Sequence, residues 1–168
     1  MIYLAADHRG FKLKEELKKF IIESGFEVKD AGAFKYNKDD DYVDFAKDAS
    51  ERLSGANADD RGIFICGSGH GMAIVADKFK GLRAAVVFNK DVAGQSRAHD
   101  NANVLALAAD WLSSDEAKEI VLVWLKTPFL GEERHVRRIG KIKEIEEKNF
   151  FAEGARLSDG HGFTYGGK

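Results

Sequence analysis

Two hydrophobic periodicities alternate along this chain of 168 residues. Short apolar runs, typical of strands buried on both faces, occupy residues 2–6, 62–65, 82–88 and 104–108, with a weaker candidate at 26–28. Longer segments with helical spacing predict helices over about residues 10–24, 43–55, 72–79, 113–127 and 135–149. Strands that alternate with helices in this way form βαβ units with right-handed crossovers. The pattern therefore predicts an α/β fold: a Rossmann-like, doubly wound parallel sheet in a three-layer α/β/α sandwich.

The length of the chain fits one domain of ordinary size. No internal repeat or low-complexity linker divides it, so we expect a single α/β domain over residues 1–149. Residues 150–168 are rich in glycine and poor in aliphatic side chains, which predicts a mobile C-terminal tail.

Composition and charge exclude several classes of function. The 26 basic and 28 acidic side chains are interspersed and give a net charge of -2, which argues against a nucleic-acid or anionic-membrane partner. No apolar run approaches the ~20 residues that span a bilayer. A single cysteine, Cys66, excludes an intrachain disulfide and any site that needs two cysteines. The N-terminus lacks the pattern of a signal peptide, so we expect a cytoplasmic protein.

The segment that follows the strand at residues 62–65 is the most informative one. It reads Cys-Gly-Ser-Gly-His-Gly over residues 66–71 and leads into a predicted helix. Its glycines let a ligand approach the backbone, and amides at a helix N-terminus favour an anion. A cysteine beside such amides is favoured as the reactive thiolate. The alternative is a buried small residue in a tight turn, but three glycines and a serine directly after a buried strand favour a site.

Three familiar motifs do not fit this loop. It lacks the Gly-Lys-Ser/Thr ending of a nucleotide-binding P-loop. Met72 stands where a dinucleotide-binding fingerprint requires glycine and where a cysteine phosphatase requires arginine. Nor do His, Cys, Asp and Glu residues recur anywhere at metal-ligand spacing, so we expect no metal and no cofactor.

Other polar clusters lie near predicted strand and helix ends. Asp7 and His8 end the first strand, and an acidic loop at residues 35–41 has a length that often borders a site. His99 is a candidate general acid or base, although a helix end complemented by its charge explains it equally well. Arg134 and Arg138 share a helix face and could bind a phosphate or carboxylate, whereas a solvated surface is the simpler explanation.

Taken in order, these segments resemble the type B ribose-5-phosphate isomerase family, which includes the galactose-6-phosphate isomerase subunits. The resemblance extends from residue 1 to about residue 148. The matching stretches are residues 7–14, 41–42, 65–71, 78–84, 96–99, 103–106 and 134–138.

The resemblance implies an aldose–ketose isomerase that acts without a metal or cofactor on a sugar phosphate, with ribose 5-phosphate and ribulose 5-phosphate as the expected pair. It implies an enediolate intermediate with Cys66 as the base, Ser68 moving a proton between the substrate oxygens, and His99 opening the sugar ring. It also implies a homodimer or dimer of dimers with active sites shared between subunits. The implied substrate-binding residues are Asp7, His8, Tyr42, Gly67, Gly69, His70, Gly71, Asp100, Arg134 and Arg138.

Several positions depart from the family pattern. Asp100 stands where asparagine is usual, and Asp110 where a substrate-contacting arginine is common; the remaining departures are Asp77, Val43 and the lengthened turn at Glu132 and Glu133. A carboxylate ~4 Å from an anionic ligand repels it by about 4 kcal/mol at an effective dielectric of 20. Either these carboxylates point elsewhere, or the preferred sugar differs in carbon number or phosphorylation. A second hypothesis, a non-catalytic sugar-phosphate sensor or interaction subunit, is weakened by the retention of Cys66, Ser68 and His99.

Overall fold

The computed structural model describes residues 1–156, and the side chains of residues 1–149. Strands and helices alternate in the order β1 (Ile2–Ala6), α1 (Phe11–Glu23), β2 (Val28–Asp30), α2 (Tyr42–Ser54), β3 (Arg61–Cys66), α3 (His70–Ala76), β4 (Ala84–Val86), α4 (Lys90–Asp100), β5 (Val104–Ala108), α5 (Ser114–Lys126) and α6 (Glu133–Arg156). The strands form one parallel sheet in the order β2-β1-β3-β5-β4, which confirms the predicted doubly wound, Rossmann-like fold. Among the described residues, no helix combines the length and apolarity required to cross a membrane.

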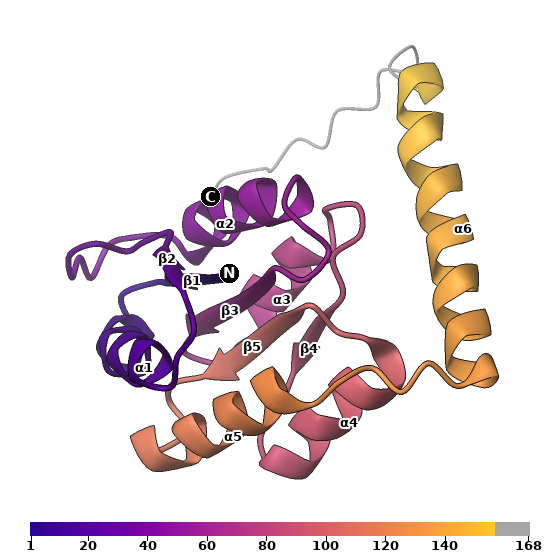
Figure 1. Cartoon of the computed structure of the whole chain (residues 1–168). Helices are drawn as coiled ribbons and strands as arrows, with labels where there is room; N and C mark the ends of the chain where they lie inside the picture. The colour runs from indigo at the N-terminus through magenta and orange to yellow at the C-terminus, as the bar shows by residue number, and fades with distance from the viewer. Residues whose placement is uncertain (157–168) are drawn as a thin grey trace.

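Helices cover both faces of the sheet (Figure 1). On one face, α1, α4 and α5 pack against the strands through a core that contains Leu17, Ala93 and the fully buried Trp124. On the other face, α2 and α3 bury Ala49 and Met72 against the sheet. The three central strands are therefore covered on both sides, as their continuous apolar runs predicted.

Side chains at the helix starts explain where the helices begin. Ser113 and Glu116 form a reciprocal capping box at the start of α5, since the Ser113 hydroxyl accepts from the Glu116 amide and the Glu116 carboxylate accepts from the Ser113 amide. Asp41 caps α2 by accepting from the amide of Val43 at 3.0 Å. Asn89 caps α4 by accepting from the amide of Val92. These caps satisfy amides that have no intrahelical acceptor.

Several predicted boundaries are wrong. Strand β2 occupies Val28–Asp30 rather than residues 26–28, and β4 is shorter than predicted. Helix α3 starts at His70, two residues before the predicted start, because Gly69 adopts a left-handed φ of 76° that turns the chain at this point. Helix α6 runs from Glu133 through Arg156 and therefore continues into the predicted tail, of which residues 157–168 lie outside the described chain.

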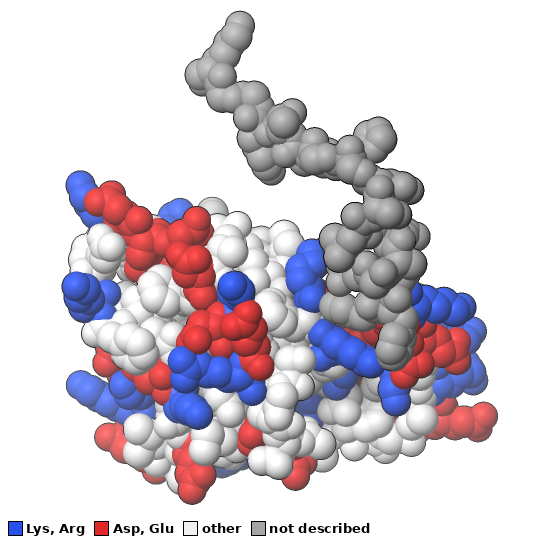
Figure 2. All heavy atoms as spheres, turned by 90° about the horizontal axis from the view of Figure 1, so that it is seen from above, with Lys and Arg blue, Asp and Glu red and all other residues white. Residues whose placement is uncertain are grey.

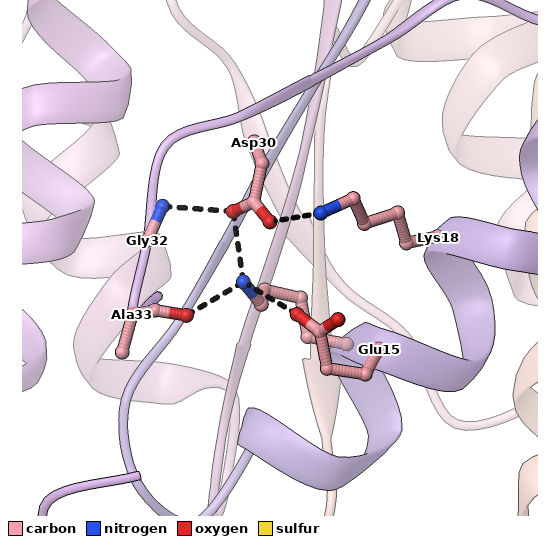
Figure 3. A network of polar contacts seen from close by, with 6 residues as sticks. Glu15, Lys18, Asp30, Gly32 and Ala33 are labelled. Carbon is pink, nitrogen blue, oxygen red and sulfur yellow. Dashed lines mark hydrogen bonds and ion pairs between the residues drawn. The ribbon is translucent and has the colours of Figure 1, made fainter. Parts of the chain in front are cut away.

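A buried lysine joins α1 to the end of β2. The Lys14 side chain is completely buried, and its Nζ donates to Asp30 Oδ1 at 2.8 Å and to the Ala33 carbonyl at 2.7 Å. Figure 3 shows that Asp30 also accepts from Lys18 and from the Gly32 amide. Burial alone would raise the pKa of Asp30, but the hydrogen bonds from Lys14, Lys18 and Gly32 outweigh it and hold the pKa below its ordinary value.

Helix α6 stands away from the sheet in Figure 1. Its Glu146 accepts from the Gly81 amide at 2.9 Å, which ties it to the turn before β4. Val136, Ile142 and Ile145 are nevertheless about half exposed or more. Contacts among the described residues therefore leave part of the predicted apolar stripe uncovered.

Candidate active site

The candidate site lies where the winding of the sheet reverses. From β1 the chain passes to β2 on one side and then, through α2, to β3 on the other side of β1. Ligands of open α/β sheets bind outside the carboxyl ends of the strands at such a switch point. Here Asp7 and His8 follow β1, while Cys66 is the last residue of β3 and is followed by the glycine loop.

The loop after β3 folds back on the sulfur of Cys66. The Gly69 amide donates to Cys66 Sγ at 3.2 Å, so the amide of this expected substrate-binding residue is not free to bind a ligand. The amides of Ser68, His70 and Gly71 donate to no acceptor in the described part of the chain. The loop therefore offers one N–H to the sulfur and others to a ligand.

The end of β1 is locked against β3. The Asp7 amide donates to the Ile65 carbonyl at 3.3 Å, and the Asp7 carboxylate accepts from the Gly10 amide at 2.9 Å. A Cβ on Gly10 would lie 2.3 Å from the Ile65 carbonyl oxygen, so only glycine fits at this contact. Burial raises the pKa of Asp7 despite the hydrogen bond from Gly10.

His8 is held by the acidic loop that the sequence predicted to border a site. Asp40 Oδ1 accepts from the His8 amide at 3.0 Å and lies 2.7 Å from His8 Nδ1. Asp40 was not among the predicted site residues. Because Nδ1 faces Asp40, the other ring nitrogen of His8 remains available to a ligand.

A cavity of about 390 Å³ opens between these elements. Its lining brings together seven of the predicted site residues and adds Arg9, which was not predicted. The lining residues are Asp7, His8, Arg9, Tyr42, Cys66, Gly67, Ser68 and Gly71.

Two further members of the predicted loop do not line this cavity. The Gly69 amide donates to Cys66, as described above. The His70 ring is exposed, and its centroid lies 6.4 Å from that of the Phe88 ring. Tyr42 covers Gly71 closely, since a Cβ there would lie 2.5 Å from the Tyr42 ring. The Cys66 side of the cavity is therefore shaped by glycines that admit neighbouring side chains.

Asp110 does not stand in the cavity as an unpaired carboxylate. The Arg9 guanidinium donates to Asp110 Oδ2, and the Asp110 amide donates to the Gly67 carbonyl at 3.1 Å. The repulsion expected from Asp110 is therefore offset by a cation from the β1–α1 turn. Arg9 could have been noticed in the sequence as a cation within the Asp7–Gly10 turn, but its pairing with Asp110 could not.

The remaining predicted site residues lie at the amino ends of the strands, opposite the carboxyl ends that carry Cys66. Helix α4 leads from the carboxyl end of β4 to the amino end of β5, and His99 and the exposed Asp100 belong to its last turn. The hydrogen bond from the Leu130 amide to the Ala98 carbonyl holds the start of α6, with Arg134, near this point. A five-residue strand spans about 15 Å, so the single chain does not bring His99 to Cys66.

His99 has a partner that the sequence did not reveal. The imidazole of His135, from α6, stacks on His99 with centroids 4.5 Å apart and an interplanar angle of 13°. Burial, together with the charges of His99 and Arg134, lowers the pKa of His135. Arg134 forms an exposed ion pair with Glu132 at 2.9 Å, and Arg138 is exposed one helical turn further on. A basic cluster that contains two imidazoles thus lies near the amino ends of the strands.

Charges of both signs lie side by side on the face shown in Figure 2. Within residues 1–149, no group of three His, Cys, Asp or Glu side chains is arranged to hold a metal ion.

Comparisons with known proteins identify the family. Residues 2–142 match the family model described as Ribose/Galactose Isomerase. The chain is 39% identical over 147 residues to a probable ribose-5-phosphate isomerase B of Mycoplasma genitalium (88% of this chain, 96% of the relative). It is 38% identical over 148 residues to a putative sugar phosphate isomerase of Bacillus subtilis (88% and 98%).

Solved structures agree with this match. The crystal structure of the Mycoplasma genitalium ribose-5-phosphate isomerase B with bound ribulose 5-phosphate superposes with a TM-score of 0.85 at 39% identity, covering 88% of this chain and 96% of that one. The Clostridium thermocellum ribose-5-phosphate isomerase B gives 0.83 at 44% identity, covering 88% and 98%. The resemblance inferred from the sequence is therefore confirmed, and the chain belongs to the ribose/galactose isomerase family.

Proposed function

We propose that this protein is an aldose–ketose isomerase of sugar phosphates, with ribose 5-phosphate and ribulose 5-phosphate as the substrate pair. Relatives named ribose-5-phosphate isomerase B, one of them solved with ribulose 5-phosphate, support this substrate class. The observation that carries the proposal is the environment of Cys66. Its sulfur lies at a cavity and accepts from the Gly69 amide at 3.2 Å.

Cys66 acts as the base in the proposed reaction. The thiolate removes the proton from C2 of the open-chain aldose, and the electron pair moves toward the carbonyl oxygen on C1 to form an enediolate. The resulting thiol, whose proton can exchange with water, then donates a proton to C1, which yields the ketose without any external oxidant or reductant. The N–H of Gly69 stabilises negative charge on sulfur, while the free amides of Ser68 and Gly71 stabilise the oxyanion. Because only protons move, the proposed reaction requires neither a metal nor a cofactor.

Ser68 carries the second proton in this scheme. Its hydroxyl, which is exposed beside Cys66, transfers a proton between the oxygens on C1 and C2. The proposed role of Asp7 and His8 is to bind sugar hydroxyls. His8 is oriented for this by its contact with Asp40, and the Asp7 carboxylate is fixed by Gly10.

We propose that each active site is completed by a second copy of the chain. His99, with Arg134 and Arg138, would reach the Cys66 cavity of a partner, where His99 opens the sugar ring and the arginines bind phosphate. Two observations support a shared site. His99 and Cys66 lie at opposite ends of the strands within one chain, and α6 exposes apolar side chains. Asp100, at the end of the same helix, would enter the partner's site beside His99.

A complementation experiment tests the shared site. Cys66→Ala and His99→Ala are each expected to be inactive alone, because every site then lacks one essential group. Co-expressed subunits that assort randomly should recover about one quarter of the wild-type activity, since half of the dimers carry one intact site of two. The control is Cys66→Ala mixed with Ser68→Ala, which lie on the same edge and should recover none. No recovery in the first mixture would show that His99 and Cys66 act within one chain.

Steady-state rates on a panel of sugars test the activity itself. We expect conversion of ribose 5-phosphate, with five- and six-carbon sugars with and without phosphate as comparison substrates. A clear preference for another sugar would change the substrate but keep the reaction. Binding without exchange of the C2 hydrogen in heavy water would instead indicate a sugar-phosphate sensor.

A further inference from the structure

Arg9 introduces a cation into the cavity that contains Cys66. The residue lies in the turn between β1 and α1, directly after His8. It is the only lysine or arginine among the residues that line this cavity in the described chain. Neither the proposed proton transfers nor the packing of α1 gives this side chain a role.

The Arg9 guanidinium lies against the backbone of the catalytic loop. A Cβ on Gly67 would be 2.6 Å from Arg9 Nε and 2.7 Å from Arg9 Cζ, so the guanidinium occupies the space that the missing side chain of the glycine leaves. The same Cβ would be 2.8 Å from Asp110 Oδ2, so the ion pair covers the residue that follows Cys66.

Asp110 fixes this arrangement from the end of β5. Its amide donates to the Gly67 carbonyl at 3.1 Å, while its carboxylate accepts from Arg9 Nη2. Asp110 is therefore hydrogen-bonded to the loop, and Arg9 lies in contact with it. A guanidinium has five N–H donors, of which Asp110 can occupy only two in a bidentate contact. The Arg9 side chain remains 57% exposed, so donors are left for a ligand in the cavity.

We infer that Arg9 is a substrate-binding residue that donates to an oxygen of the sugar at its reacting end, and that Asp110 is its positioning residue. This inference rests on the proposed function. The reacting end is favoured because Arg9 contacts the residue next to Cys66, so an oxygen bound there lies near the sulfur. Arginine suits the task since its donors are fixed in a plane and remain charged at every working pH.

Kinetics of Arg9 variants test the assignment. Arg9→Ala is expected to lower kcat/KM by about 10- to 100-fold, the range for loss of a charge-assisted hydrogen bond. The loss should be equal for ribose 5-phosphate and unphosphorylated ribose, because the contact is to the sugar. A loss confined to the phosphorylated sugar would overturn the assignment, since Arg9 would then bind phosphate. Lys12→Ala is the matched control: it removes an exposed cation from α1 that does not line the cavity, and should leave kcat/KM unchanged.

Chemical rescue separates a ligand contact from a structural one. Added guanidinium ion should restore part of the activity of Arg9→Ala, but none to Cys66→Ala. Asp110→Asn should raise KM more than it lowers kcat, and Asp110→Glu should recover most of the loss because the ion pair can re-form. Full activity in Arg9→Ala, or a loss that guanidinium cannot restore, would contradict a direct role for Arg9.

A binding measurement on inactive variants separates failure of this inference from failure of the proposed function. A wild-type protein that isomerises none of the sugars would contradict the proposed function. Calorimetric titration of ribose 5-phosphate into Cys66→Ala and into Cys66→Ala/Arg9→Ala then tests Arg9 without any turnover. We expect the second protein to bind at least about tenfold more weakly. Equal affinity would contradict the inference on Arg9 alone.

Discussion

Replacement of Cys66 by alanine is expected to lower isomerase turnover by about 10²- to 10⁴-fold, the usual contribution of a general base. Without the sulfur, no group in the proposed mechanism accepts the C2 proton. Exchange of that hydrogen with heavy water, followed by NMR, should disappear together with turnover. The fold should persist, since alanine is smaller than cysteine and the site of replacement borders a cavity that solvent can enter.

Met72→Leu provides the control for this variant. It removes a fully buried sulfur from the same core, next to the same loop, but outside the cavity, and it nearly conserves side-chain volume. Normal activity is expected here. If Cys66→Ala exchanged the C2 hydrogen as fast as the wild type while folding normally, Cys66 would not be the base.

Asp30→Ala is expected to cost about 3–5 kcal/mol of the free energy of unfolding, because it leaves a buried ammonium without its main partner. Lys14 is completely buried, and of its carboxylate partners Asp30 is the more enclosed, since Glu15 is 41% exposed. Urea denaturation of wild type and variant measures the difference. A change below about 1 kcal/mol would show that Lys14 reaches water or Glu15 compensates for the loss.

Two further variants sharpen this measurement. Lys18→Ala removes the partly exposed partner of the same carboxylate and should cost less than about 1 kcal/mol. Lys14→Met combined with Asp30→Ala should be less destabilising than Asp30→Ala alone, because no unpaired charge is then buried.

The stabilisation by Asp30 also depends on pH. Since its pKa is lower in the folded than in the unfolded protein, the contribution is complete above the ordinary value of 3.8. It declines as the pH falls below 3.8 toward the folded pKa, where the carboxylate takes up its proton. The difference in unfolding free energy between wild type and Asp30→Ala should therefore narrow in acid.

The fold and half of the site were predictable from the sequence because both depend on local pattern. The apolar runs of β1, β3 and β5 predict buried parallel strands, and the parallel sheet brings Asp7 and Cys66 to one edge. Helix α4 was considered only as a helix end near His99 and was not delimited as an element, because most of its residues are polar and it buries few of them, among them Ala93 and Arg97.

Contacts between distant residues could not be predicted in this way. Arg9 and Asp110 are 101 positions apart, and their pairing depends on how two turns meet above Gly67. The stacking of His99 on His135 likewise requires the position of α6 relative to α4. The sequence pattern indicates only that each of these residues is polar, and does not show which of them are in contact.

The close approach of Gly10 to the Ile65 carbonyl has a consequence for ligand binding. Because the β1–α1 turn cannot move away from β3 without breaking the hydrogen bond from the Asp7 amide to the Ile65 carbonyl, and because the hydrogen bond from the Gly10 amide to the Asp7 carboxylate fixes the turn itself, this wall of the cavity is formed before a ligand binds. The entropy of ordering it is lost during folding rather than on association with a sugar. The affinity of a ligand on this side is therefore not reduced by any need to organise the pocket first.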